Sequence, residues 1–190
     1  MKTISEQKAL LRKKLITKRK SFSKKEWERK SNSIKDHTLN SKEFKKAKVV
    51  HCFISINEKS EVDTHSLIKA MISYGKKIIV PVMQEDGSLL HSELINLSDL
   101  ELKKWGVLEP KNIKPVNPGI LDLILVPLLG ADINGNRLGY GKGYYDRFLN
   151  EIEAPSFGLI FEDFILEEIP NEPFDRKLNG LISEKGLIYT

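Results

Sequence analysis

Four glycines lie among basic and aromatic residues between positions 134 and 147, in the string Asn-Gly-Asn-Arg-Leu-Gly-Tyr-Gly-Lys-Gly-Tyr-Tyr-Asp-Arg. Glycines at this density let the backbone turn sharply and bring its N–H groups close to a phosphate without obstruction by side chains. Lys142 and Arg137 would supply the positive charge that phosphate oxygens need. These residue types and their spacing indicate a loop that binds a polyanion, such as the phosphates of a nucleotide.

The glycine spacing differs from the two familiar phosphate-binding fingerprints. A Walker P-loop needs a longer interval before its Lys-Ser/Thr pair, and the dinucleotide fingerprint places its glycines differently. Glycine content alone is equally compatible with a tight surface loop that carries solvated charges. The choice between these two kinds of loop therefore depends on the strand and the helix that are predicted on either side of it.

The loop follows the most apolar segment of the chain, residues 121–128, which we expect to form a central strand buried on both faces. A helix is expected to begin near Tyr144, followed by a strand at residues 156–161. In open α/β sheets, ligands gather beyond the carboxyl ends of the strands, close to helix N-termini. The glycine loop is predicted to lie at such a position.

The rest of the chain predicts the same α/β class. Capping-box spacings at residues 3–6 and 23–26 precede two segments of helical periodicity, which gives an N-terminal helical segment. We expect helices up to about Arg19 and Asn40, a helical turn near Phe44, helices at residues 64–74 and 97–104, and strands at residues 49–56, 77–83, 89–94, 180–183 and 187–189. The Asp86-Gly87 pair predicts a turn that leads into the strand at residues 89–94. A chain of 190 residues with 40% hydrophobic residues suits one domain. We therefore predict a single domain over residues 1–190, with a sheet and flanking helices.

The net charge of +5 is unevenly distributed along the chain. The first 50 residues carry 17 Lys or Arg against 5 Asp or Glu, and the remaining 140 carry 14 against 21. The basic end could meet a nucleotide, a polyglutamylated cofactor or nucleic acid, whereas a solvated helix face would need no partner. Charge alone leaves these alternatives open.

Cysteine and histidine positions exclude several kinds of site. Cys52 is the only cysteine, which rules out an internal disulfide and a multi-cysteine metal site, and its apolar, β-prone flanks predict a buried, inert thiol. The four histidines show no metal-ligand spacing. No apolar run reaches the roughly 20 residues that cross a bilayer, and the Lys-rich N-terminus lacks the apolar part of a secretory signal. We therefore expect a cytoplasmic location.

The string from Arg137 to Asp146 resembles the signature of the 5-formyltetrahydrofolate cyclo-ligase family, the methenyltetrahydrofolate synthetases. Other segments resemble the family in the expected order, at residues 8–12, 61–64, 105–110, 121–127, 132–135, 173–175 and 181–184. The resemblance covers nearly the full chain. It implies an α/β fold of the kind shared with sugar-phosphate isomerases and CoA transferases. It also implies an ATP- and magnesium-dependent enzyme that closes 5-formyltetrahydrofolate to 5,10-methenyltetrahydrofolate.

The resemblance places ATP between the N-terminal helix and the glycine loop. Lys8 and Arg12 are four residues apart and so share one helical face, which suits phosphate contacts but would equally suit a solvent-facing charge stripe. Lys142 and Arg137 are the expected catalytic cations. The expected ATP-binding residues are Lys8, Arg12, Arg137, Leu138, Gly139, Tyr140, Gly141, Lys142, Gly143, Tyr144 and Tyr145.

Magnesium and folate sites are implied in the same way. Asp146 and Asp175 would bind Mg²⁺, a hard cation suited to one or two carboxylates plus phosphate oxygens. Without the resemblance, Asp146 is a first-turn helix acid and Asp175 a turn residue. Glu61 would accept hydrogen bonds from the pterin ring. The expected substrate-binding residues are Ile54, Ile56, Glu61, Trp105 and Tyr144, although either aromatic could equally belong to the core.

Three positions depart from the family pattern, one of them only modestly, because the family's C-terminal Thr-Glu pattern appears here as Ser183-Glu184. Ala131 stands where the family commonly has Phe, which predicts a smaller wall beside the substrate. Tyr140 stands where some members have Arg, which argues against a direct charge contact there.

The implied reaction begins when the formyl oxygen attacks the γ-phosphate of ATP and ADP leaves. The neighbouring folate nitrogen then attacks the activated carbon, and loss of phosphate gives the cyclic product without a protein nucleophile. Two rival functions are a nucleic-acid-binding protein that uses the basic helices, and a sugar-phosphate isomerase or transferase on the same fold. The expected partners are ATP and 5-formyltetrahydrofolate, without nucleic acid or membrane, and the chain is expected to be a monomer.

Overall fold

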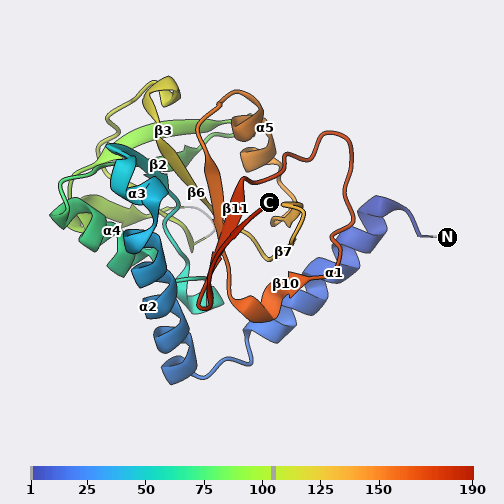
Figure 1. Ribbon diagram of the computed structural model, residues 1–190. Helices are drawn as coiled ribbons and strands as arrows, with labels where there is room; N and C mark the ends of the chain where they lie inside the picture. The colour runs from blue at the N-terminus through green and yellow to red at the C-terminus, as the bar shows by residue number, and fades with distance from the viewer. Residues whose placement is uncertain (1, 104–105) are drawn as a thin grey trace.

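The computed structural model describes residues 2–103 and 106–190 and is built on a seven-stranded sheet (Figure 1). The strand order is β12-β11-β9-β6-β1-β2-β3. Five neighbouring strands are parallel, namely β1 (Val49–Cys52), β2 (Lys77–Met83), β6 (Leu123–Val126), β9 (Ser156–Leu159) and β11 (Gly180–Ser183). Antiparallel β3 (Leu89–Leu94) and β12 (Gly186–Tyr189) form the two edges. The predicted α/β class, with one central sheet and flanking helices, is confirmed.

Two smaller sheets flank the large one. One contains β7 (Gly130–Asp132), β8 (Arg137–Leu138) and β10 (Ile165–Leu166), and the other contains β4 (Leu100–Leu102) and β5 (Leu108–Pro110). The helix expected at residues 97–104 is wrong, because a 3-10 turn at Leu97–Asp99 leads directly into β4. Pairing of β4 with β5 competes with the short helical pattern, and such tertiary pairing is not encoded in local periodicity.

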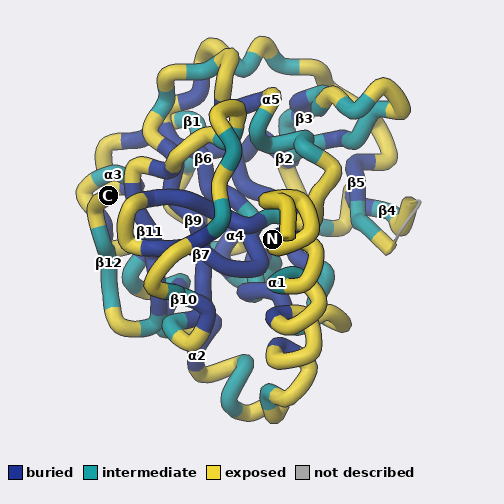
Figure 2. The backbone as a smooth tube through the Cα atoms, turned by 90° about the vertical axis from the view of Figure 1, so that its right-hand side faces the viewer, coloured by how far each residue is buried: buried dark blue, intermediate teal, exposed yellow. Residues whose placement is uncertain are grey.

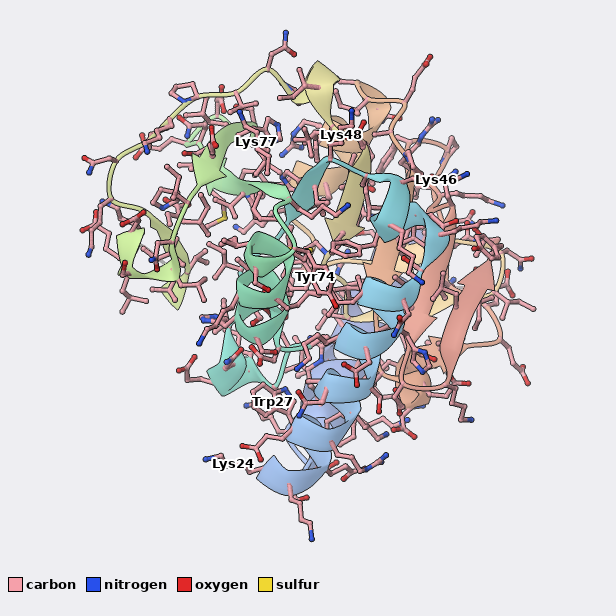
Figure 3. All side chains as sticks on the ribbon, turned by 60° about the vertical axis from the view of Figure 1, so that its left-hand side comes forward. Lys24, Trp27, Lys46, Lys48, Tyr74 and Lys77 are labelled. Carbon is pink, nitrogen blue, oxygen red and sulfur yellow. The ribbon has the colours of Figure 1, made fainter. Side chains whose placement is uncertain are left out.

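The other predicted helices form with nearly the expected bounds. They are α1 (Ile4–Arg19), α2 (Lys24–Asn40), α3 (Lys42–Lys46), α4 (Thr64–Ser73) and α5 (Tyr144–Asn150). At the start of α1, the Thr3 side chain accepts a hydrogen bond from the Glu6 N–H, while the Glu6 carboxylate accepts one from the Thr3 N–H at 2.8 Å. This is the reciprocal capping that the sequence predicts. Figure 3 shows α2 and α4 side by side on one face of the sheet, with Trp27 near the start of α4.

The order of the strands reverses direction between β1 and β6. From β1 the chain passes through α4 to β2 on one side, whereas from β6 it passes through α5 to β9 on the other side. Right-handed crossovers in opposite directions place their helices on opposite faces of the sheet. They also leave a crevice between the carboxyl ends of the two diverging strands, where ligands bind in folds of this kind.

The central strands are buried on both faces (Figure 2). Ile124, Leu125 and Val126 of β6 are fully buried, as is Cys52 at the end of β1. Burial raises the pKa of the Cys52 thiol, which favours its protonated form, and the predicted burial of this cysteine is confirmed. No helix within the described residues has the length and apolar character needed to cross a membrane.

Candidate active site

A cleft of about 660 Å³ opens at the carboxyl ends of β1, β2 and β6, where the strand order reverses. It is lined by every predicted site residue that the structure describes, namely Lys8, Arg12, Ile54, Ile56, Glu61, Arg137, Leu138, Gly139, Tyr140, Gly141, Lys142, Gly143, Tyr144, Tyr145, Asp146 and Asp175. Trp105 lies outside the described residues, and its neighbours Val107 and Leu108 line the cleft. Segments far apart in sequence therefore meet in one cavity.

The buried carboxylate of Asp132 fixes the turn that leads into the glycine loop. Its Oδ1 accepts hydrogen bonds from the N–H groups of Asn134 at 2.9 Å and Asn136 at 3.1 Å. Its Oδ2 accepts from the Asn136 side chain and from the Ile169 N–H, both at 2.9 Å. Four donors offset the cost of burying this charge. The Asp132 carboxylate thus sets the direction in which Arg137 leaves the turn.

The glycine loop packs directly against α1. Gly141 has a φ of 92°, and a Cβ atom built there would lie 3.0 Å from Cζ of Arg12. Arg12 Nε also donates to the Gly139 carbonyl at 2.9 Å. A side chain at position 141 would be strained in conformation and would displace the guanidinium. Glycine is needed here so that a basic residue of α1 can lie against the loop backbone.

Two cations of the cleft, Lys8 and Arg137, form ion pairs with carboxylates. Lys8 is buried and its Nζ contacts carboxylates of Asp175 and, at 2.9 Å, Glu172. The NH2 group of Arg137 lies 2.6 Å from Oδ1 of Asp146, and this ion pair opposes the burial that lowers the pKa of Arg137. The residues expected to contact phosphate and those expected to contact magnesium are thus brought together as ion pairs.

The donor set in the cleft fits a magnesium ion that is held mainly by a nucleotide. Asp146 and Asp175 both line the cavity, and their side chains are 26% and 15% exposed. Within the described ranges, no group of three or more His, Cys, Asp or Glu residues could hold a metal ion. Mg²⁺ commonly takes one or two carboxylates, with phosphate and water oxygens completing its shell.

Glu61 is held from several sides at the other end of the cleft. Its Oε2 accepts a hydrogen bond from the Ile56 N–H at 2.8 Å, and its Oε1 accepts one from the hydroxyl of Tyr140. The indole N–H of Trp27 donates to the Glu61 carbonyl at 2.6 Å. The buried Glu61 carboxylate therefore has a fixed position in the wall of the cleft.

The two neighbouring tyrosines at the start of α5 have different surroundings. Tyr144 donates to the Gln84 carbonyl at 3.1 Å and lines the cleft. Tyr145 packs against His51 and Phe148, with ring centroids 5.9 and 6.0 Å apart, and burial raises the pKa of its hydroxyl. Tyr144 is therefore bound to a loop, whereas the ring of Tyr145 is part of the cavity floor.

The sequence did not indicate that Arg147 supports the glycine loop, or that the turn between β2 and β3 lines the cleft. Arg147 Nε donates to the Gly87 carbonyl at 3.0 Å, and its NH2 group donates to the Lys142 carbonyl at 2.9 Å. Asp86 and Gly87 line the cleft opposite the glycine loop. The Asp-Gly pair predicted the turn itself, but nothing in local spacing indicates that this turn meets α5.

Comparison with known proteins accounts for this arrangement. The family model described as the 5-formyltetrahydrofolate cyclo-ligase family matches residues 4–184. The chain belongs to this family. The 5-formyltetrahydrofolate cyclo-ligase of Mus musculus is 29% identical over 198 residues, with 96% of each chain covered. The enzyme of the same name from Haemophilus influenzae is 32% identical, with 79% of this chain and 83% of the relative covered.

Solved structures show the same relationship. The NMR structure of 5,10-methenyltetrahydrofolate synthetase from Aquifex aeolicus has a TM-score of 0.85 at 32% identity, covering 96% of this chain and 92% of that one. A 5,10-methenyltetrahydrofolate synthetase from Mycoplasma pneumoniae has a TM-score of 0.75 at 22% identity and supports the fold alone. The predicted membership of a ligase family in folate and one-carbon metabolism is confirmed.

Proposed function

We propose that this member of the cyclo-ligase family uses ATP to close 5-formyltetrahydrofolate to 5,10-methenyltetrahydrofolate, releasing ADP and phosphate. The observation that carries the proposal is the convergence of the glycine loop, the α1 cations and Glu61 in one cleft. The cleft lies within the roughly 300–1,000 Å³ that small-molecule sites occupy. Cations of α1 and of the glycine loop line the cleft, and its apolar groups, including Ile54 and Met83, would offer surface to a ring system.

The proposed reaction proceeds through a phosphorylated formyl group. The formyl oxygen attacks the γ-phosphorus of ATP, ADP leaves, and the adjacent folate nitrogen attacks the activated carbon before phosphate departs. The phosphorylation turns a poor leaving oxygen into a good one. Lys142 and Arg137 would neutralise charge on the transferred phosphoryl group, and Lys8 and Arg12 would hold the remaining phosphates. The protein's work is positioning and charge neutralisation, which agrees with a cleft that offers bases and cations but needs no nucleophile.

Magnesium is part of the proposal through Asp146 and Asp175. When bound with ATP, the ion would screen the phosphate charge and favour one phosphate geometry. Both carboxylates line the cleft. Each forms an ion pair with a cation that is predicted to contact phosphate, Asp175 with Lys8 and Asp146 with Arg137. When a nucleotide binds, its phosphates would replace the carboxylates as partners of Lys8 and Arg137. The magnesium ion would then bind the released carboxylates of Asp175 and Asp146.

The proposal also covers the fold type, partners and location. We assign residues 1–190 to one domain of the fold shared with sugar-phosphate isomerases and CoA transferases. We also propose a monomer without a nucleic-acid or membrane partner. The burial of Lys8, Arg19 and Lys30 reduces the basic N-terminal surface that a nucleic acid or an anionic membrane would contact. The consumption of ATP favours the cytoplasm.

An absorbance assay tests the proposed function directly. Purified protein would be mixed with 5-formyltetrahydrofolate, magnesium and ATP, and growth of the methenyl absorbance band would be followed. We expect growth only when ATP is present, with one ADP released for each product molecule. A folded protein that gives no band under these conditions would contradict the proposal, and ribose phosphates would then be tested as substrates of the fold-sharing rival.

A further inference from the structure

Tyr140 connects the nucleotide side of the cleft with the folate side. Its backbone belongs to the glycine loop, between Gly139 and Gly141, but its hydroxyl reaches Oε1 of Glu61. The same hydroxyl accepts a hydrogen bond from NH1 of Arg19 at 3.2 Å. The phenol therefore joins a cation of α1 to the carboxylate that follows β1.

Both groups joined by Tyr140 are buried, although the tyrosine itself is 41% exposed. Arg19 is 3% exposed and is anchored by its NH2 group, which donates to the Leu128 carbonyl at 2.7 Å. Glu61 is 6% exposed. Buried charges need hydrogen-bonded partners, and removing one partner leaves a costly unpaired group. The Tyr140 hydroxyl gives each of these two charged groups a hydrogen-bonded partner.

The phenol acts as the donor toward Glu61. Burial and the adjacent negative charge of Glu61 raise the pKa of Tyr140, so its proton stays on the hydroxyl at neutral pH. Arg19 can only donate, which leaves the Tyr140 proton directed to Oε1 of Glu61. Arg19 therefore donates a hydrogen bond to the Tyr140 hydroxyl, and this hydroxyl donates one to Glu61.

The remaining hydrogen-bonding capacity of Glu61 suits a particular kind of ligand. An ionised carboxylate can accept about four hydrogen bonds, two at each oxygen. Ile56 N–H occupies one place on Oε2 and Tyr140 occupies one place on Oε1. Among the described residues no other donor reaches this carboxylate, which leaves one place on each oxygen and matches a planar heterocycle with two adjacent N–H donors. A pterin presents this fork through its 2-amino group and the neighbouring ring N–H.

We propose that Tyr140 is a positioning residue, which orients the Glu61 carboxylate so that it can accept two hydrogen bonds from the pterin. This proposal rests on the proposed function. Its hydroxyl holds Oε1 while the backbone of Ile56 holds Oε2, so the carboxylate is fixed before the substrate arrives. Such pre-organisation reduces the entropy lost on binding. The specificity of the folate site then depends on a residue of the nucleotide-binding loop.

The test compares two tyrosine-to-phenylalanine variants in a binding assay. Tyr140→Phe removes only the bridging hydroxyl. Tyr189→Phe is the matched control, because the Tyr189 hydroxyl also binds a glutamate, Glu43 at 3.0 Å, but neither residue lines the cleft. Calorimetric titration with 5-formyltetrahydrofolate in the absence of ATP would give Kd for each protein, and thermal unfolding would verify that each is folded.

We expect Tyr140→Phe to raise the Kd for 5-formyltetrahydrofolate about five- to tenfold, which is the size expected for the loss of one ordinary hydrogen bond. Tyr189→Phe should stay within about twofold of the wild type. In the turnover assay, Tyr140→Phe should raise KM for the folate while KM for ATP changes less than about twofold. A general loosening of the fold would raise both KM values together.

Two further measurements separate orientation from an indirect effect. In a cycle with Glu61→Gln, the folate penalty of Tyr140→Phe should shrink, because the two residues act through one hydrogen bond. A folate analogue that lacks the 2-amino group should lose affinity for the wild type and lose less for Tyr140→Phe. Equal folate affinity of Tyr140→Phe and wild type, or additive penalties in the cycle, would overturn the role of Tyr140 alone. Absence of any folate binding to the folded wild type would overturn the proposed function as well.

Discussion

Arg137 and Asp146 form an ion pair, with NH2 of the arginine 2.6 Å from Oδ1 of the aspartate. The arginine is a predicted phosphate contact and the aspartate a predicted magnesium ligand. Lys8 and Asp175 repeat this relationship across 167 residues of sequence. We therefore predict that a nucleotide and its magnesium bind by exchange, in which the phosphates pair with Arg137 and Lys8 while the metal ion binds Asp146 and Asp175. Exchange of this kind predicts that ATP and Mg²⁺ strengthen each other's binding.

Replacement of Asp146 by Asn tests the exchange. In the absence of magnesium, we expect ATP to bind Asp146→Asn no more weakly than wild type, because Arg137 has lost its anionic partner. Addition of magnesium should strengthen ATP binding to wild type, and Asp146→Asn should lose most of this gain, roughly tenfold for one charged ligand. Calorimetric titration of ATP with and without Mg²⁺ measures both quantities.

Asp163→Asn provides the control for that experiment, because Asp163 pairs with Lys30 and does not line the cleft. It should keep the full magnesium-dependent gain in ATP affinity. An equal gain in Asp146→Asn and wild type would remove Asp146 from the metal site and leave it as the structural partner of Arg137.

Lys142→Ala tests the phosphate role of the glycine loop. Lys142 is exposed in the cleft wall, so its removal should change the free energy of unfolding by no more than about 0.5 kcal/mol. Turnover should fall at least about a hundredfold, as loss of one preorganised electrostatic contact to the transition state predicts. The absorbance assay and urea unfolding give the two values. Lys69→Ala, on the exposed part of α4, should leave both unchanged, and near-normal turnover in Lys142→Ala would contradict the assignment.

Arg147 should position the two facing walls of the cleft. Its guanidinium donates to Gly87 in the β2–β3 turn and to Lys142 in the glycine loop. A Cβ atom at Gly87 or Gly143 would lie only 2.7 or 2.8 Å from this group. We expect Arg147→Ala to raise KM for ATP about three- to tenfold, with a smaller change in KM for the folate.

Hydrogen exchange supplies the structural readout for Arg147. Amides at residues 84–88 should exchange faster in Arg147→Ala than in the wild type, because the turn loses one of its ties to α5. Arg147→Lys keeps the charge but lacks the planar guanidinium, so it should slow the exchange of these amides only part of the way back to the wild-type rate. Arg29→Ala, an exposed arginine of α2, is the matched control. Unchanged exchange in the turn would contradict the positioning role.

The sequence predicted the elements that have strong local signals. Periodicity and the Asp86-Gly87 pair gave β2 and β3 their observed bounds, because an apolar run and a turn residue with φ near 86° are local properties. The strand predicted at residues 49–56 ends earlier, at Cys52, because its apolar residues continue into the cleft wall without a ladder partner in the sheet. A run of apolar residues in the sequence indicates that a segment is buried. Whether the segment is a strand depends on backbone hydrogen bonds to a neighbouring strand, which the run does not show.

The sequence predicted which residues line the candidate site. It did not predict the hydrogen bonds and ion pairs that these residues form with each other. The signature around Lys142 and the short match at Lys8 predicted residues that line one cleft. Their present partners depend on long-range packing, since Lys8 meets Asp175 and Tyr140 meets Glu61 only after the sheet has formed. β7 and β8 were likewise missed, because strands of two or three residues carry no period and rely on their neighbours.

Two buried histidines below the cleft predict how stability depends on pH. His51 of β1 and His91 of β3 lie with ring centroids 5.3 Å apart, and both contact the ring of Phe148. Burial lowers the pKa of His51 well below 6.5, with the charge of His91 as a second cause, and burial lowers the pKa of His91 to about 4. Both rings are therefore neutral in the folded protein at neutral pH.

In the unfolded chain each histidine titrates near its ordinary pKa, so below about pH 6.5 the unfolded state binds more protons than the folded state. The free energy of unfolding should thus be highest above about pH 7 and fall as the pH is lowered toward 4, by at most about 1.4 kcal/mol per pH unit for each histidine. Asp163, whose pKa is lowered chiefly by its hydrogen bond to Lys30, adds a further loss only below about pH 5.

Urea unfolding at pH 7.5, 6.0 and 5.0 would measure this dependence in wild type, His51→Leu and the control His37→Gln on α2. His51→Leu removes one titrating group and leaves an apolar side chain of similar size, so its loss of stability between pH 7.5 and 5.0 should be smaller than that of wild type. His37→Gln should retain the wild-type slope because His37 lies outside the His51–His91–Phe148 cluster. Parallel pH profiles for wild type and His51→Leu would show that His51 is not kept neutral by folding.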